Sequence, residues 1–180
     1  MIDFLQRYGL PLLFLLVMAE SSGVPVPGET ALITAALLAS RGHFDIAAVI
    51  VVAAVAAIIG DNIGYLLGRV GGRRVLLRWG FVAKHAEKGL PKAERFFQRH
   101  GGKTVFFARF IAGLRVFGAW VAGMTKMPWG RFLVWNAAGG ICWALVFGLG
   151  TYYLGKAAVE AFARGGLVAA AVWWRRKRRR

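Results

Sequence analysis

Two long apolar runs constrain this chain more than any other feature of its sequence. One extends from Ile46 to Gly68 with a single charged residue, Asp61, and the other from Phe132 to Leu154 with none. About 20 apolar residues are enough for a helix to cross a bilayer. Because lipid tolerates only backbone whose hydrogen bonds are closed within the segment, both runs are predicted to be transmembrane helices.

The composition agrees with an integral membrane protein. Hydrophobic residues make up 58% of the 180 residues and charged residues 18%, which is more apolar surface than a water-soluble domain of this size can bury. The 24 lysines and arginines against 8 acidic residues give a formal net charge of +16, so anionic partners are expected. The single cysteine, Cys142, excludes an internal disulfide. No metal site and no cofactor are expected, because the three histidines lie far apart.

Two further apolar segments are interrupted by turn-forming residues. Residues 10–19 and 31–39 would each be helices of about 15 Å, half the hydrocarbon thickness of roughly 30 Å. Residues 20–29 between them contain two prolines and two glycines, which prevent a continuous helix. This pattern predicts a re-entrant helical hairpin over about residues 10–40, and residues 104–127 repeat the plan.

The predicted fold is therefore all-α, with two inverted repeats. Each repeat is a re-entrant hairpin followed by one transmembrane helix, an arrangement from which many transporters are built. Residues 1–156 form this transmembrane domain. Residues 157–180 are predicted to be a further transmembrane helix, because Trp173 and Trp174 precede a basic stop at residues 175–180.

The basic residues predict the orientation. Residues 69–103 carry many lysines and arginines against only Glu87 and Glu94, and the C-terminal tail adds six more basic residues. By the positive-inside rule, both segments are expected on the cytoplasmic side of the cytoplasmic membrane. A polybasic run directly inside a span usually holds anionic lipid headgroups, so nucleic acid is not expected as a partner.

Ionisable groups at membrane depth are costly unless they are paired or hydrated, so each of them needs a reason. Acids in the first hairpin and arginines in the second could meet at mid-membrane as a structural ion-pair network. They could also form a site, in which guanidinium groups hold phosphate and carboxylates carry protons. The candidates are Glu20, Glu29 and Asp61 for proton coupling, Arg109 and Arg115 for phosphate, and Asn62 and Asn136 as supporting polar groups.

Two features of the first long run have alternative interpretations. Asp61 and Asn62 could bind a proton or could simply form hydrogen bonds between helices. Gly60, Gly64 and Gly68 recur every four residues, and close helix packing explains this spacing better than a ligand does.

Three motifs together resemble the DedA family, also called the SNARE-associated or VTT family. They are Glu20-x-x-Gly23-x-Pro25-x-Pro27-Gly28-Glu29, Gly60-Asp61-x-x-Gly64-Tyr65-x-x-Gly68-Arg69 and Phe107-Ala108-Arg109-Phe110-Ile111-x-Gly113-x-Arg115, followed by Asn136 and Trp143. The resemblance extends over roughly residues 20–155. One departure is Ala112, which stands where the family usually has a proline and leaves the rigidity of the second turn open.

The resemblance implies a function as well as a fold. Bacterial members of the family recycle undecaprenyl phosphate or move phospholipids, and eukaryotic relatives are scramblases. Members are linked to the proton motive force through two acids and two arginines, which correspond to Glu20, Glu29, Arg109 and Arg115. We therefore expect a flippase-like transporter for an anionic, phosphate-bearing membrane lipid, coupled to protons as the resemblance implies.

Other functions remain open at this point. A proton-coupled antiporter or channel for small ions or cationic compounds would use the same acids, and a membrane scaffold would need no transport at all. An enzyme is not expected, because no nucleophile has a base beside it. The sequence allows a homo-oligomer but decides neither the oligomeric state nor the lipid.

Overall fold

The structure, a computed structural model of the chain, describes residues 2–78, 95, 99, 101–111 and 114–177. Side chains are described for residues 8–71, 95, 99, 101–111, 115 and 117–157. Within these residues the regular elements are all helices. They are α1 (Ile2–Ser22), α2 (Gly28–Ser40), α3 (Ile46–Arg78), α5 (Gly102–Ala108), α6 (Leu114–Met124) and α7 (Trp129–Lys177).

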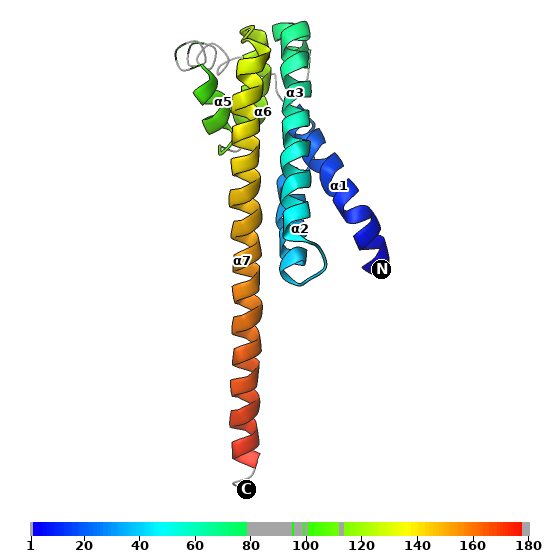
Figure 1. The fold of residues 1–180 in the computed structure, drawn as a ribbon, viewed down its shortest axis with the longest axis vertical. Helices are drawn as coiled ribbons and strands as arrows, with labels where there is room; N and C mark the ends of the chain where they lie inside the picture. The colour runs from blue at the N-terminus through cyan, green and yellow to red at the C-terminus, as the bar shows by residue number, and fades with distance from the viewer. Residues whose placement is uncertain (1, 79–94, 96–98, 100, 112–113, 178–180) are drawn as a thin grey trace.

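Helices α3 and α7 are the two long elements around which the others pack. They run in opposite directions side by side (Figure 1), and their apolar parts, Ile46–Gly71 and Trp129–Ala157, are long enough to cross a membrane. Large apolar side chains such as Val51 and Val146 are exposed along their outer faces. Exposed apolar side chains in such numbers suit a lipid environment. Both predicted spans are thus confirmed as long apolar helices.

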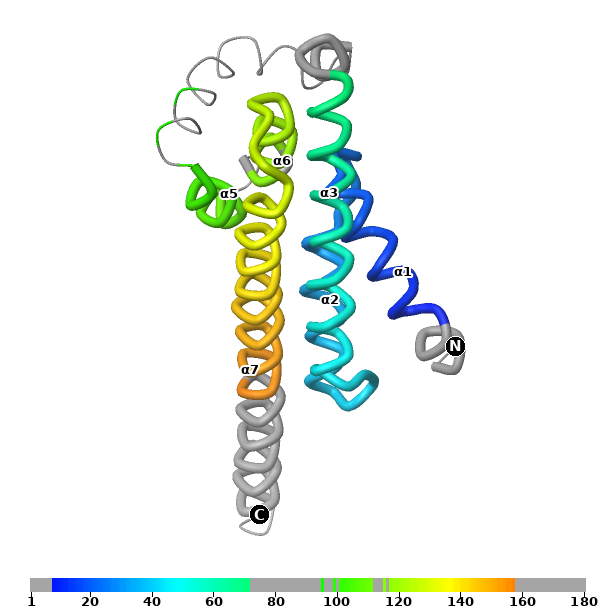
Figure 2. Tube along the Cα trace, turned by 45° about the horizontal axis from the view of Figure 1, so that its top comes forward, coloured from blue at the N-terminus to red at the C-terminus, as the bar shows by residue number. Residues whose placement is uncertain are grey.

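Helices α1 and α2 form the first helix–break–helix unit, where the sequence predicts a hairpin. Gly23 ends α1 with a φ of +118°, a conformation that favours glycine. Pro25 and Pro27 follow, and neither has an N–H to continue a helix. The chain then reverses, so that α2 lies beside α1 and packs on α3 and α7 (Figure 2). Helix α1 begins earlier than the sequence predicts, because Pro11 is accommodated within it.

Helices α5 and α6 form the second such unit: α5 lies on the opposite side of α7 from α1 (Figure 1), whereas α6 packs on α3. Helix α5 ends at Ala108 and α6 begins at Leu114, inside the predicted second hairpin over residues 104–127, and Arg115 lies in the first turn of α6. Ala112 lies outside the described residues, as does most of the predicted cytoplasmic segment 69–103. Two helix–break–helix units are therefore present where the sequence places them. Their re-entry into a membrane and their relation as inverted repeats stay predictions.

The C-terminal region differs from its prediction. The sequence predicts a transmembrane helix over 132–154 and a separate one from 157, whereas α7 is one continuous helix from Trp129 to Lys177. The junction contains Gly155 but no proline, and a single glycine costs a helix only about 1 kcal/mol. A chain that does not turn back near residue 155 cannot bring the C-terminus to the side on which α7 begins. A continuous α7 thus conflicts with the prediction that residues 69–103 and the tail share one side, because α3 ends where α7 begins (Figure 1). Which side the tail occupies stays a prediction from charge.

Glycines let α3 approach its neighbours closely. A Cβ at Gly60 would collide with the backbone of Met18 in α1, and one at Gly68 would collide with the backbone of Trp120 in α6. Gly123 of α6 lies equally close to the backbone of Tyr65. The interpretation of the glycine spacing as a packing surface is confirmed, and this close approach brings both helix–break–helix units onto one helix.

Candidate functional site

Arg115 lies between two carboxylates that come from the first helix–break–helix unit. Its guanidinium forms an ion pair with Glu20, and a second one with Glu29 at 3.8 Å between Arg115 Nη1 and Glu29 Oε2. The Arg115 side chain is only 9% exposed, whereas Glu20 is 20% and Glu29 39% exposed. We call these three residues the Arg115 cluster. It is the convergence of hairpin acids and hairpin arginine that the sequence predicts.

The local sequence explains why these side chains meet. Glu20 is in the last turn of α1 and Glu29 in the first turn of α2, so the short break brings both carboxylates to the same end of the unit. Gly28 makes room for them: a Cβ there would lie 2.5 Å from Glu20 Oε2 and 2.8 Å from the carbonyl oxygen of Leu16. Only a glycine therefore lets α2 begin beside the Glu20 carboxylate.

Two tryptophans complete this region. The Trp143 ring, 2% exposed in the core, lies 5.2 Å from the Arg115 guanidinium carbon, a cation–π distance. The Trp120 indole N–H donates to the carbonyl oxygen of Ser22 at 3.1 Å. Because Trp120 belongs to α6 and Ser22 ends α1, this bond fastens one helix–break–helix unit to the other.

Arg109 occupies a second, closed cluster. Its guanidinium forms an ion pair with Asp61 of α3, and its Nη2 donates to Asn136 Oδ1 of α7 at 2.8 Å. Asp61, Arg109 and Asn136 are at most 5% exposed. Asn136 is itself held, since its Nδ2 donates to the carbonyl oxygen of Ile58 at 3.1 Å. We call Asp61, Arg109 and Asn136 the Arg109 cluster.

Gly140 provides the space that the Arg109 side chain occupies. A Cβ at this position of α7 would lie 2.7 Å from Arg109 Nη1. The arginine at the end of α5 is thus inserted between α3 and α7. There its charge is balanced by one carboxylate and its donors are shared with one amide oxygen, which is the pairing that a buried charge requires.

Asn62 does not join either cluster. Its Nδ2 donates to the carbonyl oxygen of Ile58 at 2.8 Å, and its Oδ1 accepts a bond from the Trp129 indole N–H at 3.0 Å. Neighbouring residues of a helix point about 100° apart, so Asp61 and Asn62 cannot both face the same cluster. Asn62 instead fastens the start of α7 to α3, which is the interhelical alternative considered for it.

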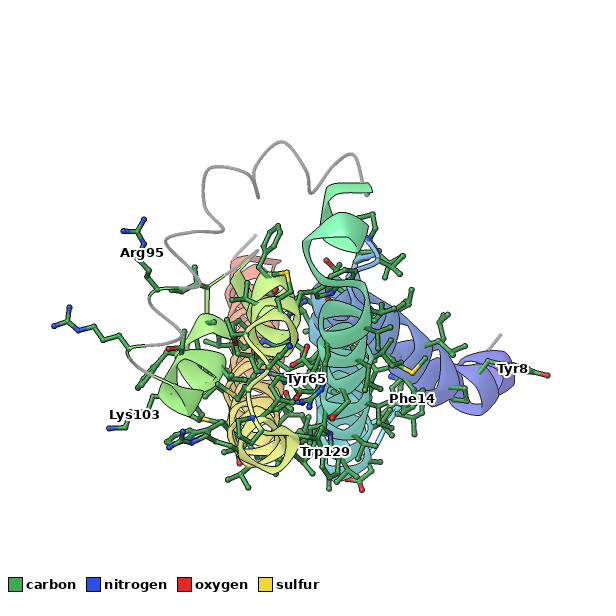
Figure 3. All side chains as sticks on the ribbon, turned by 90° about the horizontal axis from the view of Figure 1, so that it is seen from above. Tyr8, Phe14, Tyr65, Arg95, Lys103 and Trp129 are labelled. Atoms are coloured by element: carbon green, nitrogen blue, oxygen red, sulfur yellow. The ribbon has the colours of Figure 1, made fainter. Side chains whose placement is uncertain are left out.

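A third polar contact joins Tyr65 and Arg69 of α3 to the turn before α7. The Tyr65 hydroxyl donates to the carbonyl oxygen of Met127, and Arg69 Nη1 donates to the Tyr65 hydroxyl. Figure 3 shows Tyr65 pointing between the helices, whereas Arg95 and Lys103 project outward. The sequence pattern contained both Tyr65 and Arg69, but nothing in it specified Met127 as their partner.

The two clusters differ in charge and in access. Two carboxylates and one guanidinium give the Arg115 cluster a formal net charge of −1. The Arg109 cluster is neutral, with one of each. Only the Arg115 cluster has a half-exposed member, Glu29. All five charged residues predicted for the site belong to one of the two clusters, and so does Asn136. Asn62 lies outside both. Among the described residues, no group of three His, Cys, Asp or Glu could hold a metal ion.

Comparison with known proteins agrees with these motifs. The family model described as the VTT domain matches residues 26–157, the part of the chain that contains Glu29, both arginines and both long apolar helices. The chain belongs to the DedA (VTT domain) family. Protein DedA of Escherichia coli is 31% identical over 161 residues, covering 85% of this chain and 73% of that protein.

Further relatives carry membrane-protein names. An uncharacterized membrane protein of Mycobacterium tuberculosis is 41% identical over 160 residues, covering 85% of this chain and 73% of its own. One from Synechocystis is 34% identical over 154 residues, covering 86% of this chain and 71% of its own. The chain is thus a DedA-family membrane protein. No solved structure matches it.

Proposed function

We propose that this protein moves a phosphate-bearing lipid across the cytoplasmic membrane of a bacterium, with a proton taken up during each cycle. The observation that carries the proposal is the Arg115 cluster. A nearly buried guanidinium, held by two carboxylates from a different helix–break–helix unit, lies among helices with apolar outer faces. Arginine offers forked donors that match phosphate oxygens. The family resemblance, which implies lipid transport, points in the same direction.

The charge of the cluster explains why protons and phosphate would be coupled. With both carboxylates ionised the cluster has a formal charge of −1 and repels an anion. Protonation of one carboxylate makes it neutral and frees donors on Arg115. In this proposal Glu29 takes up the proton and releases Arg115, because Glu29 is more exposed than Glu20 and its oxygen lies 3.8 Å from the guanidinium.

The remaining residues have supporting roles in this proposal. Trp143 keeps the Arg115 guanidinium in place while its carboxylate partners exchange for phosphate. Arg109 was predicted as a second phosphate ligand, but its side chain is buried and its Nη2 already contacts Asp61 and Asn136. We therefore assign Arg109 as a positioning residue that holds the second break against α3 and α7. No bond of the lipid is broken.

A reconstituted transport assay tests the proposal. Arg115→Gln should slow the transfer of a phosphate-bearing lipid between leaflets of proteoliposomes by at least about tenfold, equivalent to ~1.4 kcal/mol. Arg131→Gln, at an exposed arginine of α7, is the matched control and should keep the wild-type rate. Equal rates in the wild type and Arg115→Gln would exclude the phosphate clamp.

The coupling is tested by Glu29→Gln. In the wild type, a proton gradient should accelerate transfer, whereas the glutamine variant should transfer lipid at the same rate with and without the gradient. A glutamine at this position can neither take up nor release a proton, so that the step requiring a proton at residue 29 is removed. A variant that keeps the full response to the gradient would show that Glu29 does not carry the proton.

One observation favours a second candidate, a proton-coupled antiporter for small cations. The net negative charge of the Arg115 cluster suits a cation as well as a proton. Proton flux in liposomes that responds to a small cation, and that a phosphate-bearing lipid does not inhibit, would support this function over lipid transfer.

A further inference from the structure

An apolar groove of about 300 Å³ lies between α1 and α2, outside both ion-pair clusters. Leu12, Leu13 and Leu16 of α1 form one wall, and Thr30, Thr34 and Leu38 of α2 contribute to the other. The two threonines add little polarity, because the Thr34 hydroxyl donates to the carbonyl oxygen of Thr30 within the helix. The groove is partly open and is lined mainly by the first helix–break–helix unit.

One end of the groove leads to the Arg115 cluster. Leu13, Leu16 and Glu20 are spaced by three and four residues, so they follow one another along a single face of α1. Pro27 lines the same end of the groove. The next residue, Gly28, lies against the Glu20 carboxylate that pairs with Arg115. The apolar walls therefore end at charged side chains.

The other end is closed by an aromatic ring. Phe44, in the connection between α2 and α3, lines the groove beside Gly9 of α1. A Cβ at Gly9 would lie 2.5 Å from the ring, so α1 and the ring are in direct contact. The groove thus has a defined length, with a charged end and an aromatic end.

We propose that this groove holds one hydrocarbon chain of the transported lipid while its phosphate is bound at Arg115. An amphiphile with an anionic head and an apolar chain has the same order of polarity as the site: guanidinium, then carboxylate, then leucines. When the hydrocarbon chain lies in the groove, the apolar surfaces of the chain and of the groove cover each other. The phosphate at the head is then directed toward Arg115. This inference rests on the proposed function and adds where the chain of the substrate lies.

Two matched pairs of substitutions test the groove. Leu12 and Leu15 are each 55% exposed on α1, but only Leu12 lines the groove. On α2, Thr34 lines the groove and the neighbouring exposed residue Ile33 does not. Leu12→Trp and Thr34→Phe fill the groove, whereas Leu15→Trp and Ile33→Phe add the same side chains on the surface outside it.

Transfer of a long-chain phosphate-bearing lipid should fall by about tenfold in Leu12→Trp and Thr34→Phe and by less than about twofold in the two controls. Binding of inorganic phosphate should be the same in all four variants, since Arg115 is untouched. Equal transfer within both pairs would overturn the groove. If Arg115→Gln nevertheless abolished transfer, the proposed function would stand without it, whereas wild-type transfer by Arg115→Gln would refute the function itself.

Photolabelling of the wild type provides a test that needs no variant. A phosphate-bearing lipid with a diazirine midway along its chain should label α1 and α2 at the groove more than the exposed residues Ile59 of α3 and Val146 of α7. An unlabelled phosphate-bearing lipid should compete. Uniform labelling of all apolar faces, without competition, would mean that the groove holds only bulk lipid and would overturn the proposal.

Discussion

Asp61 and Arg109 show how closely a single buried charge depends on its partner. Both side chains are nearly inaccessible, and Asn136 accepts a further hydrogen bond from the guanidinium. A buried ion pair adds little stability compared with apolar side chains, but removing one partner leaves the other charge uncompensated. Arg109 therefore owes its position to a carboxylate that lies far from it in the sequence.

Asp61→Ala should lower the free energy of unfolding by about 3–5 kcal/mol, because Arg109 would stay buried without a counter-charge. The double variant Asp61→Ala, Arg109→Ala should lose clearly less than the sum of the two single variants, since it leaves no uncompensated charge. Thermal unfolding in detergent measures both. Strictly additive losses would show that the two residues do not stabilise each other.

Individual residues could be predicted to different degrees. Glu20, Glu29, Arg109 and Arg115 stand out in the sequence because charges in apolar surroundings need partners. Their pairing does not follow from that rule, which applies equally to every acid and every arginine. Trp143 was found only through the family motif, because a buried tryptophan in an apolar helix has no local signature of a cation partner.

At the scale of helices, the close approach of α3 to α6 holds the second unit in place. Gly68 lies against the backbone of Trp120, and Gly123 lies against the backbone of Tyr65. A backbone atom cannot move aside as the end of a flexible side chain can. Small residues at such crossings are a common means of joining helices in membranes.

Gly68→Ala should therefore destabilise the protein by about 1–3 kcal/mol, the usual cost of overpacking. It should also slow transport, because α6 carries Arg115 and would move away from α3. Gly150→Ala is the control, since nothing lies within 4 Å of the added Cβ. Equal unfolding temperatures for the two variants would contradict the assignment of this crossing as close-packed.

The helices themselves were largely predictable. Apolar length predicts α3 and the first part of α7, and prolines with glycines predict the break between α1 and α2. The sequence does not predict the continuity of α7, because interfacial tryptophans and a basic stop mark a helix end equally well for one long helix or two shorter ones.

Among the residues whose side chains are described, the core and both clusters lie within a limited part of the sequence. The two apolar core clusters and their packed neighbours lie within residues 10–152. The ion-pair clusters lie within residues 20–136. The VTT domain match ends at residue 157. The family match therefore predicts a functional unit that ends near residue 157.

A chain that ends at Ala157 should consequently keep its fold, with an unfolding temperature within a few degrees of that of the full chain and with transport at a comparable rate. The shorter chain keeps all the residues that define the two ion-pair clusters, which lie between residues 20 and 136. Circular dichroism and the proteoliposome assay measure the two properties. Loss of transport by a folded truncated protein would assign a function to the basic C-terminal segment.

Hydropathy, turn residues and rare membrane charges were enough to predict an all-helical membrane protein with two broken units and a short set of site residues. These properties are local, because each depends on a residue and its neighbours along the chain. Which acid pairs with which arginine, and which pair is closed, depends instead on contacts between residues far apart in the sequence. Glycines at the helix crossings set those distances, and no local pattern encodes where two backbones will meet.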